Sequence, residues 1–188
     1  MRRLKPQALI APEGAAWPDL GCLATTIDQW ERSHSRKLPV DYTSFLTTYN
    51  GGRIYPSIFN VQQPPEVWGM SDFSTFLDPL YDWQHAAELW SGSTYLDGTP
   101  PGMFFLGCNP GGLEMLISLR PHDHGRIFSW WGSSVTWGEP GNNESNIYVQ
   151  SSNFTNFIDQ MYESENEQSL SYWDSPRHRA LARLLKVG

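Results

Sequence analysis

The clearest periodic pattern of apolar positions lies between Leu38 and Gly52. Pro39 suits the first turn of a helix, where a missing backbone N–H costs little, and Asp41 places a carboxylate near the positive end of the helix dipole. Four apolar side chains then recur at helical spacing and form one face: Tyr42, Phe45, Leu46 and Tyr49. Asn50-Gly51-Gly52 closes the pattern, because Asn and Gly tolerate the left-handed conformation that ends many helices. The stretch therefore predicts a complete helix.

Three further segments have helical spacing. From Asp19 to about Ser33, apolar residues recur three or four positions apart: Leu20, Leu23, Ile27 and Trp30. After residue 150, Ser151 or Ser152 is the expected cap of a helix whose apolar face is Phe154, Phe157, Ile158 and Met161. Tyr172–Lys186 predicts a basic terminal helix with Leu181, Leu184 and Leu185 on its apolar side.

The region from Met103 to Gln150 has the pattern of strands separated by turns. The expected strands are residues 103–106, 113–119, 126–131 and 146–150. Turns rich in Gly and Pro at 109–112 and 121–125 predict an antiparallel meander. Residues 113–119 alternate only partly, which indicates a central strand buried on both faces. The neighbouring Trp130 and Trp131 would point to opposite faces of their strand, so that one can lie in the core.

The rest of the chain is less regular. Arg53–Phe59 is expected to be a strand, and its Pro56 indicates an edge or a bend. Phe73–Trp90 is expected to hold one or two short helices, broken near Pro79. These patterns divide the chain into an N-terminal arm (1–19), one domain (20–163) with an irregular aromatic and acidic insertion (60–101), and a polar linker with the basic C-terminal helix (164–188).

Charge is distributed unevenly over the 188 residues. The chain has a net charge of −7, but residues 38–176 hold three Lys/Arg against sixteen Asp/Glu. A body so poor in cations is not expected to bind nucleic acid, because phosphate contacts need Lys and Arg. It suits a basic protein partner, although an acidic surface also simply keeps proteins soluble. The first residues lack the apolar stretch of a secretory signal and no run is long enough to cross a bilayer, so we expect a cytoplasmic address and no membrane association.

Motifs that carry chemistry are scarce. The sequence has no GxSxG, HExxH or GxxxxGK[ST]. Cys22 and Cys108 form no CxxC, and both are expected to be buried thiols. His122-Asp123-His124 could offer two imidazoles to a metal, but alternate residues on a turn rarely converge without other ligands, so no metal is expected. His85 near Asp82 and Glu88 could form a general-base setting, although a solvated helix face is the simpler interpretation.

Taken in order, these segments resemble the SUKH superfamily, a group of bacterial toxin-immunity proteins related to fungal regulators of cell-wall synthesis. The matching motifs are Leu38-Pro39, Asp41-Tyr42, Phe45-Leu46 and Asn50-Gly51-Gly52, then Phe104-Phe105-Leu106-Gly107, Gly111-Gly112-Leu113 with Ile117-Ser118-Leu119, Gly125-Arg126-Ile127-Phe128-Ser129-Trp130, and Ile147-Tyr148-Val149 with Ser151-Ser152-Asn153-Phe154-Thr155-Asn156-Phe157-Ile158. The resemblance implies a single α+β domain, with helices packed on a mostly antiparallel sheet, no catalytic residue and no cofactor.

The resemblance implies an immunity protein that binds and blocks one bacterial toxin, such as a nuclease or another enzyme that acts in the cytoplasm. A regulatory scaffold for a host protein is the first alternative, and a carbohydrate-active enzyme with tryptophan platforms and paired carboxylates is the second. Aromatic anchors ringed by carboxylates would suit a basic toxin surface. We therefore expect a monomer or weak dimer whose partner-binding residues are Glu66, Trp68, Asp72, Asp78, Asp82, Trp83, Glu88, Asp97 and Trp131.

Overall fold

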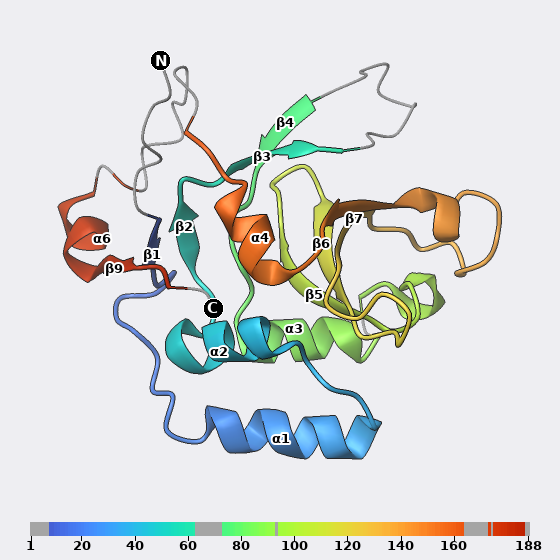
Figure 1. The fold of residues 1–188 in the computed structure, drawn as a ribbon, viewed down its shortest axis with the longest axis horizontal. Coiled ribbons are helices and arrows are strands. Elements are labelled where there is room, and N and C mark those ends of the chain that lie inside the picture. Colours follow the sequence, from blue (N-terminus) through green and yellow to red (C-terminus); the bar gives the residue numbers. More distant parts are fainter. Residues whose placement is uncertain (1–7, 63–72, 93, 164–172, 174, 187–188) are drawn as a thin grey trace.

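The core of the molecule is a four-stranded antiparallel sheet, seen in a computed structural model that describes residues 8–62, 73–92, 94–163, 173 and 175–186 (Figure 1). Its strands follow one another in space as they do in sequence: β5 (Met103–Cys108), β6 (Leu113–Ser118), β7 (Ile127–Trp131) and β8 (Ile147–Ser151). Every residue of β6 is buried, which confirms the predicted central strand. Trp130 is 1% exposed while Trp131 is half-buried, as expected for neighbours on opposite faces.

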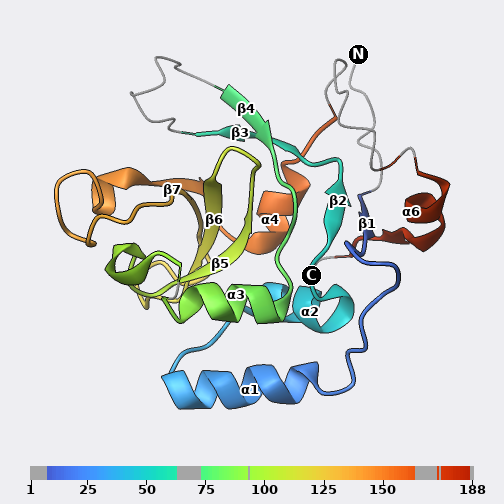
Figure 2. The same cartoon turned by 180° about the vertical axis from the view of Figure 1, so that it is seen from behind.

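Three helices pack along one side of this sheet, where α1 (Leu23–His34) lies outside α2 (Val40–Tyr49) and α3 (Trp83–Trp90) (Figures 1 and 2). Their aromatic side chains meet at Phe104 of β5, which is fully buried. The ring of Phe104 lies 5.2 Å from Trp30, 5.8 Å from Trp83 and 6.3 Å from Tyr42. Such aromatic contacts bury large areas, so this single residue couples all three helices to the sheet.

The helix after β8 is α4 (Phe154–Asp159). Its cap is Asn153, whose side chain accepts a hydrogen bond from the amide of Asn156 at 2.7 Å, so the expected Ser151 or Ser152 cap was wrong by one or two residues. Asn is as good a cap as Ser, and the apolar face alone does not fix which polar residue takes this position. Phe154 packs 5.2 Å from Tyr42, which ties α4 to α2.

A second sheet joins both ends of the chain. β1 (Leu9–Ala11), from the predicted arm, lies between β2 (Arg53–Tyr55) and β9 (Arg183–Leu184), and both pairings are antiparallel. β9 replaces the end of the helix expected over Tyr172–Lys186: α6 covers only Pro176–Leu181, and Ala182 is extended. The pairing with β1, about 175 positions away in sequence, overrides the local helical spacing.

The remaining elements correct two expectations. The strand expected over Arg53–Phe59 is divided at Pro56, and its second part, β3 (Ile58–Val61), forms a two-stranded sheet with β4 (Phe73–Phe76). Residues 73–76 are thus a strand where a helix was expected, whereas α3 confirms the helix after Pro79. Short 3₁₀ helices η2 (Leu96–Gly98) and η3 (Glu144–Asn146) complete the fold. Within the described residues, no helix has both the length and the apolar character to span a membrane.

Candidate partner-binding surface

The turn Asn50-Gly51-Gly52 is the point where β1, α2 and α3 meet. Its three residues have φ angles of 53°, 82° and 129°, the left-handed region that favours Asn and Gly. A Cβ on Gly51 would lie 2.5 Å from the backbone nitrogen of Asp82, and one on Gly52 would lie 2.5 Å from the carbonyl oxygen of Ala11. Only glycine permits this close approach, so the two glycines fix where α3 and the N-terminal segment sit.

Two sets of hydrogen bonds hold the elements at this turn. The Asn50 side chain accepts a hydrogen bond from the amide of Trp83 at 2.7 Å, so the end of α2 holds the start of α3. Gly52 and Leu80 exchange two backbone hydrogen bonds, each 2.9 Å long. The residues that end α2 therefore also hold the start of α3 and the segment before it in place.

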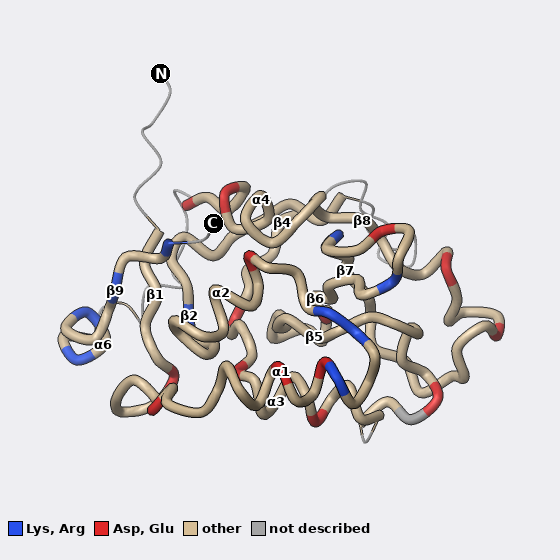
Figure 3. The backbone as a smooth tube through the Cα atoms, turned by 60° about the horizontal axis from the view of Figure 1, so that its bottom comes forward, with Lys and Arg blue, Asp and Glu red and all other residues tan. Residues whose placement is uncertain are grey.

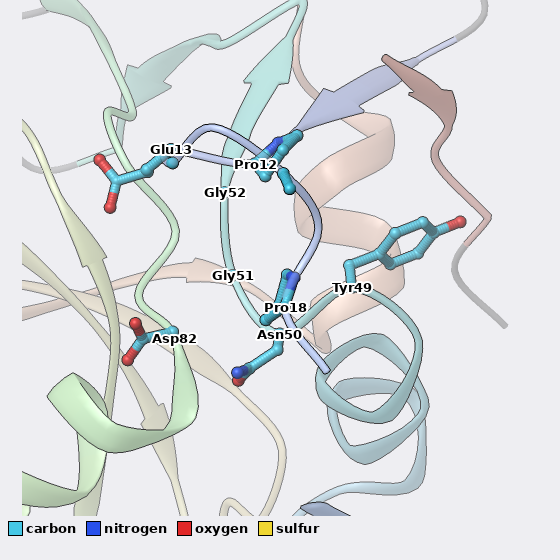
Figure 4. Close-up of a pocket in the computed structure, with 10 residues that line it drawn as sticks. Pro12, Glu13, Pro18, Tyr49, Asn50, Gly51, Gly52 and Asp82 are labelled. Atoms are coloured by element: carbon cyan, nitrogen blue, oxygen red, sulfur yellow. The ribbon is translucent and has the colours of Figure 1, made fainter. Parts of the chain in front are cut away.

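A pocket of about 200 Å³ opens beside this turn (Figure 4). One wall is the turn with Tyr49, a second is Asp82, and the third is the N-terminal segment, with Pro12, Glu13 and Pro18. Figure 4 shows the carboxylates of Glu13 and Asp82 on one side of the turn and the Tyr49 ring on the other. The pocket therefore has one negatively charged side and one aromatic side.

Among the described residues, the carboxylates near the pocket outnumber the cations that pair with them. Arg53 donates to Asp78 at 2.8 Å and lies 3.8 Å from Glu13, so one guanidinium serves two carboxylates. Burial raises the pKa of Glu13; Arg53 opposes this shift, and the nearby Asp78 and Asp82 reinforce it. Burial likewise raises the pKa of Asp78 against the effect of Arg53. A cationic group from outside would relieve this repulsion.

The negative charge continues along α3. Asp82 caps the helix by accepting a hydrogen bond from the amide of His85 at 2.8 Å. Glu88 is exposed further along the same helix and accepts a hydrogen bond from Gln84 at 2.9 Å. His85 itself is exposed and its ring lies 4.5 Å from that of Tyr81 in a tilted contact, which supports a solvated helix face rather than a general-base setting. We call Glu13, Asp78, Asp82 and Glu88 together the acidic face.

The structure brings together only some of the residues expected to bind a partner. Asp78, Asp82 and Glu88 lie on the acidic face. Asp97 and Trp131 belong to another part of the molecule: the Asp97 carbonyl accepts a hydrogen bond from Trp137, and the Trp131 ring stacks on Phe73. Three more of these residues, Glu66, Trp68 and Asp72, lie outside the described residues.

Trp83 and Glu13 show where sequence patterns and the surface differ. Trp83 is 8% exposed and packs in the core between Trp30 and Phe104, so its side chain is not offered to a partner. Glu13 was missed, because it lies in the arm, far in sequence from the other acids of this face, and reaches Asp78 and Asp82 only when β1 pairs with β2. Its position two residues after the apolar strand β1 was the only signal in the sequence.

One buried polar cluster lies on the central strand. Glu114 of β6 is 5% exposed, and its carboxylate accepts hydrogen bonds from the hydroxyls of Tyr81 at 3.0 Å and Tyr95 at 2.7 Å. Burial raises the pKa of Glu114, and the two tyrosine hydrogen bonds oppose the shift. The carboxylate is enclosed by its partners, which is the arrangement of a satisfied core group.

The histidine and cysteine side chains are accounted for in other ways. Asp123, between His122 and His124, pairs with Arg120, and His124 contacts the carbonyl of Lys37 at 2.8 Å. Among the residues that the structure describes, no group of three or more His, Cys, Asp and Glu could hold a metal ion. Cys22 is exposed, contrary to the expectation of a buried thiol, because it precedes α1 at the surface.

The fold and the signature turn can now be set beside known families. The family model described as the SMI1 / KNR4 family (SUKH-1) matches residues 21–160, about three quarters of the chain. The chain belongs to this family. The resemblance seen in the sequence and the α+β fold that it implied are thereby confirmed. Comparisons with curated proteins and with solved structures gave no match.

The residues that line the pocket lie partly inside and partly outside the family match. Its turn, residues 50–52, and Asp82 lie within the matched residues, whereas Pro12, Glu13 and Pro18 precede them. The pocket thus combines the family's signature turn with a wall that lies outside the family match.

Proposed function

We propose that this SUKH-1 protein is an immunity protein, which binds one protein toxin in a one-to-one complex and blocks it without catalysis. Family membership supports the class of function, and the acidic face supports the mode of binding. The partner would present a basic surface, because clustered carboxylates steer and orient a positively charged protein. Loops and helix ends on a rigid sheet are where binding specificity usually resides.

The observation that carries the proposal is the unbalanced charge around the pocket. Asp78 and Asp82 both lie close enough to Glu13 to raise its pKa, and among the described residues the Arg53 side chain pairs with Glu13 and Asp78. A protein pays for such repulsion in stability. A Lys or Arg of a partner, placed between Glu13 and Asp82, would convert the repulsion into two charge-assisted hydrogen bonds.

The first experiment identifies the partner. The tagged full chain is purified from its native source, and the co-eluting proteins are identified by mass spectrometry. We expect one toxin fragment at a one-to-one ratio, whose activity the purified chain inhibits stoichiometrically. A metabolic enzyme or a kinase in its place would favour a regulatory scaffold, the alternative that the fungal relatives of the superfamily suggest.

A second experiment tests the surface. Glu13→Gln and Asp82→Asn remove charge but keep hydrogen-bonding groups, and Asn still caps a helix. The double variant should bind the partner at least about tenfold more weakly, and the loss should shrink as salt is added. Glu139→Gln combined with Asp159→Asn is the matched control, because both of these acids are exposed and neither lines the pocket. Equal affinity of the two double variants would refute the acidic face as the binding site.

A further inference from the structure

A second surface, distinct from the acidic face, is an open groove of about 780 Å³ at the start of α2. Its walls come from the connector between α1 and α2, from the first turns of α2, from the turn before β7 and from the start of α4. They include Lys37, Pro39, Val40, His124 and Thr155. None of the residues that line this groove lines the pocket of the acidic face.

The wall of the groove is more apolar than polar, and its most prominent side chain is Val40. Val40 is 85% exposed, about twice the fraction of any other exposed large hydrophobic residue that the structure describes. Leu38 and Pro39 beside it are buried and form an apolar floor. A valine at the first position of a helix gains nothing from that position, since polar and acidic residues are favoured there.

The charge bordering this groove is positive, which is unusual for this chain. Arg36 immediately precedes Lys37, a lining residue that pairs with Glu31, and Arg126 follows the lining residue Gly125. Among the described residues, neither Arg36 nor Arg126 takes part in an ion pair. Figure 3 shows the cations of residues 32–37 well away from those of α6 and β9.

The acid within the groove is already satisfied. The carboxylate of Asp41 accepts hydrogen bonds from the amide of Thr155 at 3.0 Å and from the amide of Tyr42 at 2.9 Å. Pro39 provides no side-chain cap, and Asp41 supplies a carboxylate in the first turn of α2, a helix of ten residues. The groove therefore combines an apolar wall with two bordering arginines, Arg36 and Arg126, that form no ion pair among the described residues.

We propose that this groove docks a protein segment in which an apolar side chain lies next to a carboxylate. The apolar side chain packs on Val40 and Pro39, and the carboxylate faces the bordering arginines. Charge complementarity selects this occupant over a basic one, which Arg36 and Arg126 would repel. The proposal does not depend on the proposed function, because the two surfaces share no lining residue.

The test uses the full chain and a displayed library of random peptides. Peptides are selected on the wild-type chain and then measured, one by one, against Val40→Asp. This substitution places a carboxylate in the first turn of α2, where the helix dipole favours it, so the fold is expected to hold. It should weaken an acidic, apolar peptide by at least about 100-fold, because it removes the apolar contact and adds like charge.

Two controls separate the groove from the rest of the surface. Val135→Asp makes the same change at a loop residue that is 44% exposed and does not line the groove, and it should leave binding unchanged. Arg126→Glu should weaken binding about fivefold and reduce its salt dependence. An empty selection, acidic and apolar peptides that bind Val40→Asp as well as wild type, or basic peptides that Val40→Asp weakens would each overturn the proposal.

Discussion

The acidic face and the groove at the start of α2 lie at opposite ends of the same helix. α2 begins at the groove, with Pro39 and Val40, and ends at the pocket, with Asn50 and Gly51. The groove is lined entirely by residues within the family match, whereas one wall of the pocket, residues 12–18, precedes it. The groove therefore lies within the part of the chain that matches the family, whereas one wall of the pocket lies outside that part.

The largest expected loss of stability comes from a substitution in the turn beside the acidic face. Gly51→Ala places a Cβ 2.5 Å from the backbone of Asp82 at a residue with φ of 82°, so we expect a loss of about 3 kcal/mol or more in unfolding free energy. The measurement is urea denaturation. Gly112→Ala is the matched control: its φ is 87°, but no atom lies within 4 Å of the added Cβ, so it should cost only about 1 kcal/mol. Equal losses would mean that the close approach to Asp82 does not limit stability.

The next largest loss of stability is expected when a buried carboxylate beside the groove is removed. Asp123, in the turn that carries His124 and Gly125, accepts hydrogen bonds from Ser118 and Arg120, and Arg120 also pairs with Glu144 at 2.7 Å. Asp123→Asn should cost about 2 kcal/mol near neutral pH, since hydrogen bonds to charged groups are among the stronger ones.

The pH dependence of this loss has a defined sign. Burial raises the pKa of Asp123, but the hydrogen bonds from Arg120 and Ser118 outweigh it and hold the pKa below its usual value. A carboxyl group whose pKa is lower in the folded state stabilises the fold above its unfolded pKa and loses that contribution as pH falls through the folded value. The difference between wild type and Asp123→Asn in urea unfolding should therefore vanish in strong acid; a difference that persists there would contradict the assignment.

A smaller effect is expected where the C-terminal segment holds the end of α2. The Tyr49 hydroxyl donates to the carbonyl of Leu184 at 2.8 Å and accepts from the amide of Lys186 at 3.0 Å. Tyr49→Phe should cost about 1 kcal/mol and speed amide exchange in β1 and β9, with little change at the groove. Tyr148→Phe, on the exposed side of β8, is the control substitution. Faster exchange across the whole chain would show that the hydroxyl supports more than this junction.

The smallest effect is electrostatic and distinguishes the two regions without a mutation. Glu13 and Asp78 should titrate above the usual range of their residue types, and Asp123 below it, when followed by carboxyl NMR. Because a raised carboxyl pKa means that protonation favours the folded state, mild acid should remove charge from the acidic face without unfolding it. Normal titration of Glu13 would contradict the crowding of carboxylates around the pocket.

Local sequence patterns were sufficient for the elements whose partners are close in sequence. The α2 helix, the meander from β5 to β8 and the buried strand β6 were predicted, because spacing, turn residues and the order of strands all agree there. Local patterns gave wrong predictions for β4 and β9, because the conformation of these strands depends on pairing with β3 and β1. Pairing of this kind leaves no local signal in segments of two to four residues.

The candidate site shows the same division. Asp82 and Glu88 were found because they lie in an acid-rich stretch, but Trp83, between them, is a core residue whose burial follows from the helix face it occupies. Glu13 could not be found, because it joins the acidic face only through the pairing of β1 with β2. The sequence shows where acidic residues are concentrated, but strand pairing determines which of them lie close together in the fold.

The acidic face is proposed to bind a basic partner. The most direct measurement is calorimetric titration of the partner recovered with the tagged chain against wild type, the double variant Glu13→Gln with Asp82→Asn, and Val40→Asp. We expect a one-to-one complex that the double variant weakens at least about tenfold and that Val40→Asp leaves unchanged. A complex weakened by Val40→Asp and indifferent to the double variant would contradict it.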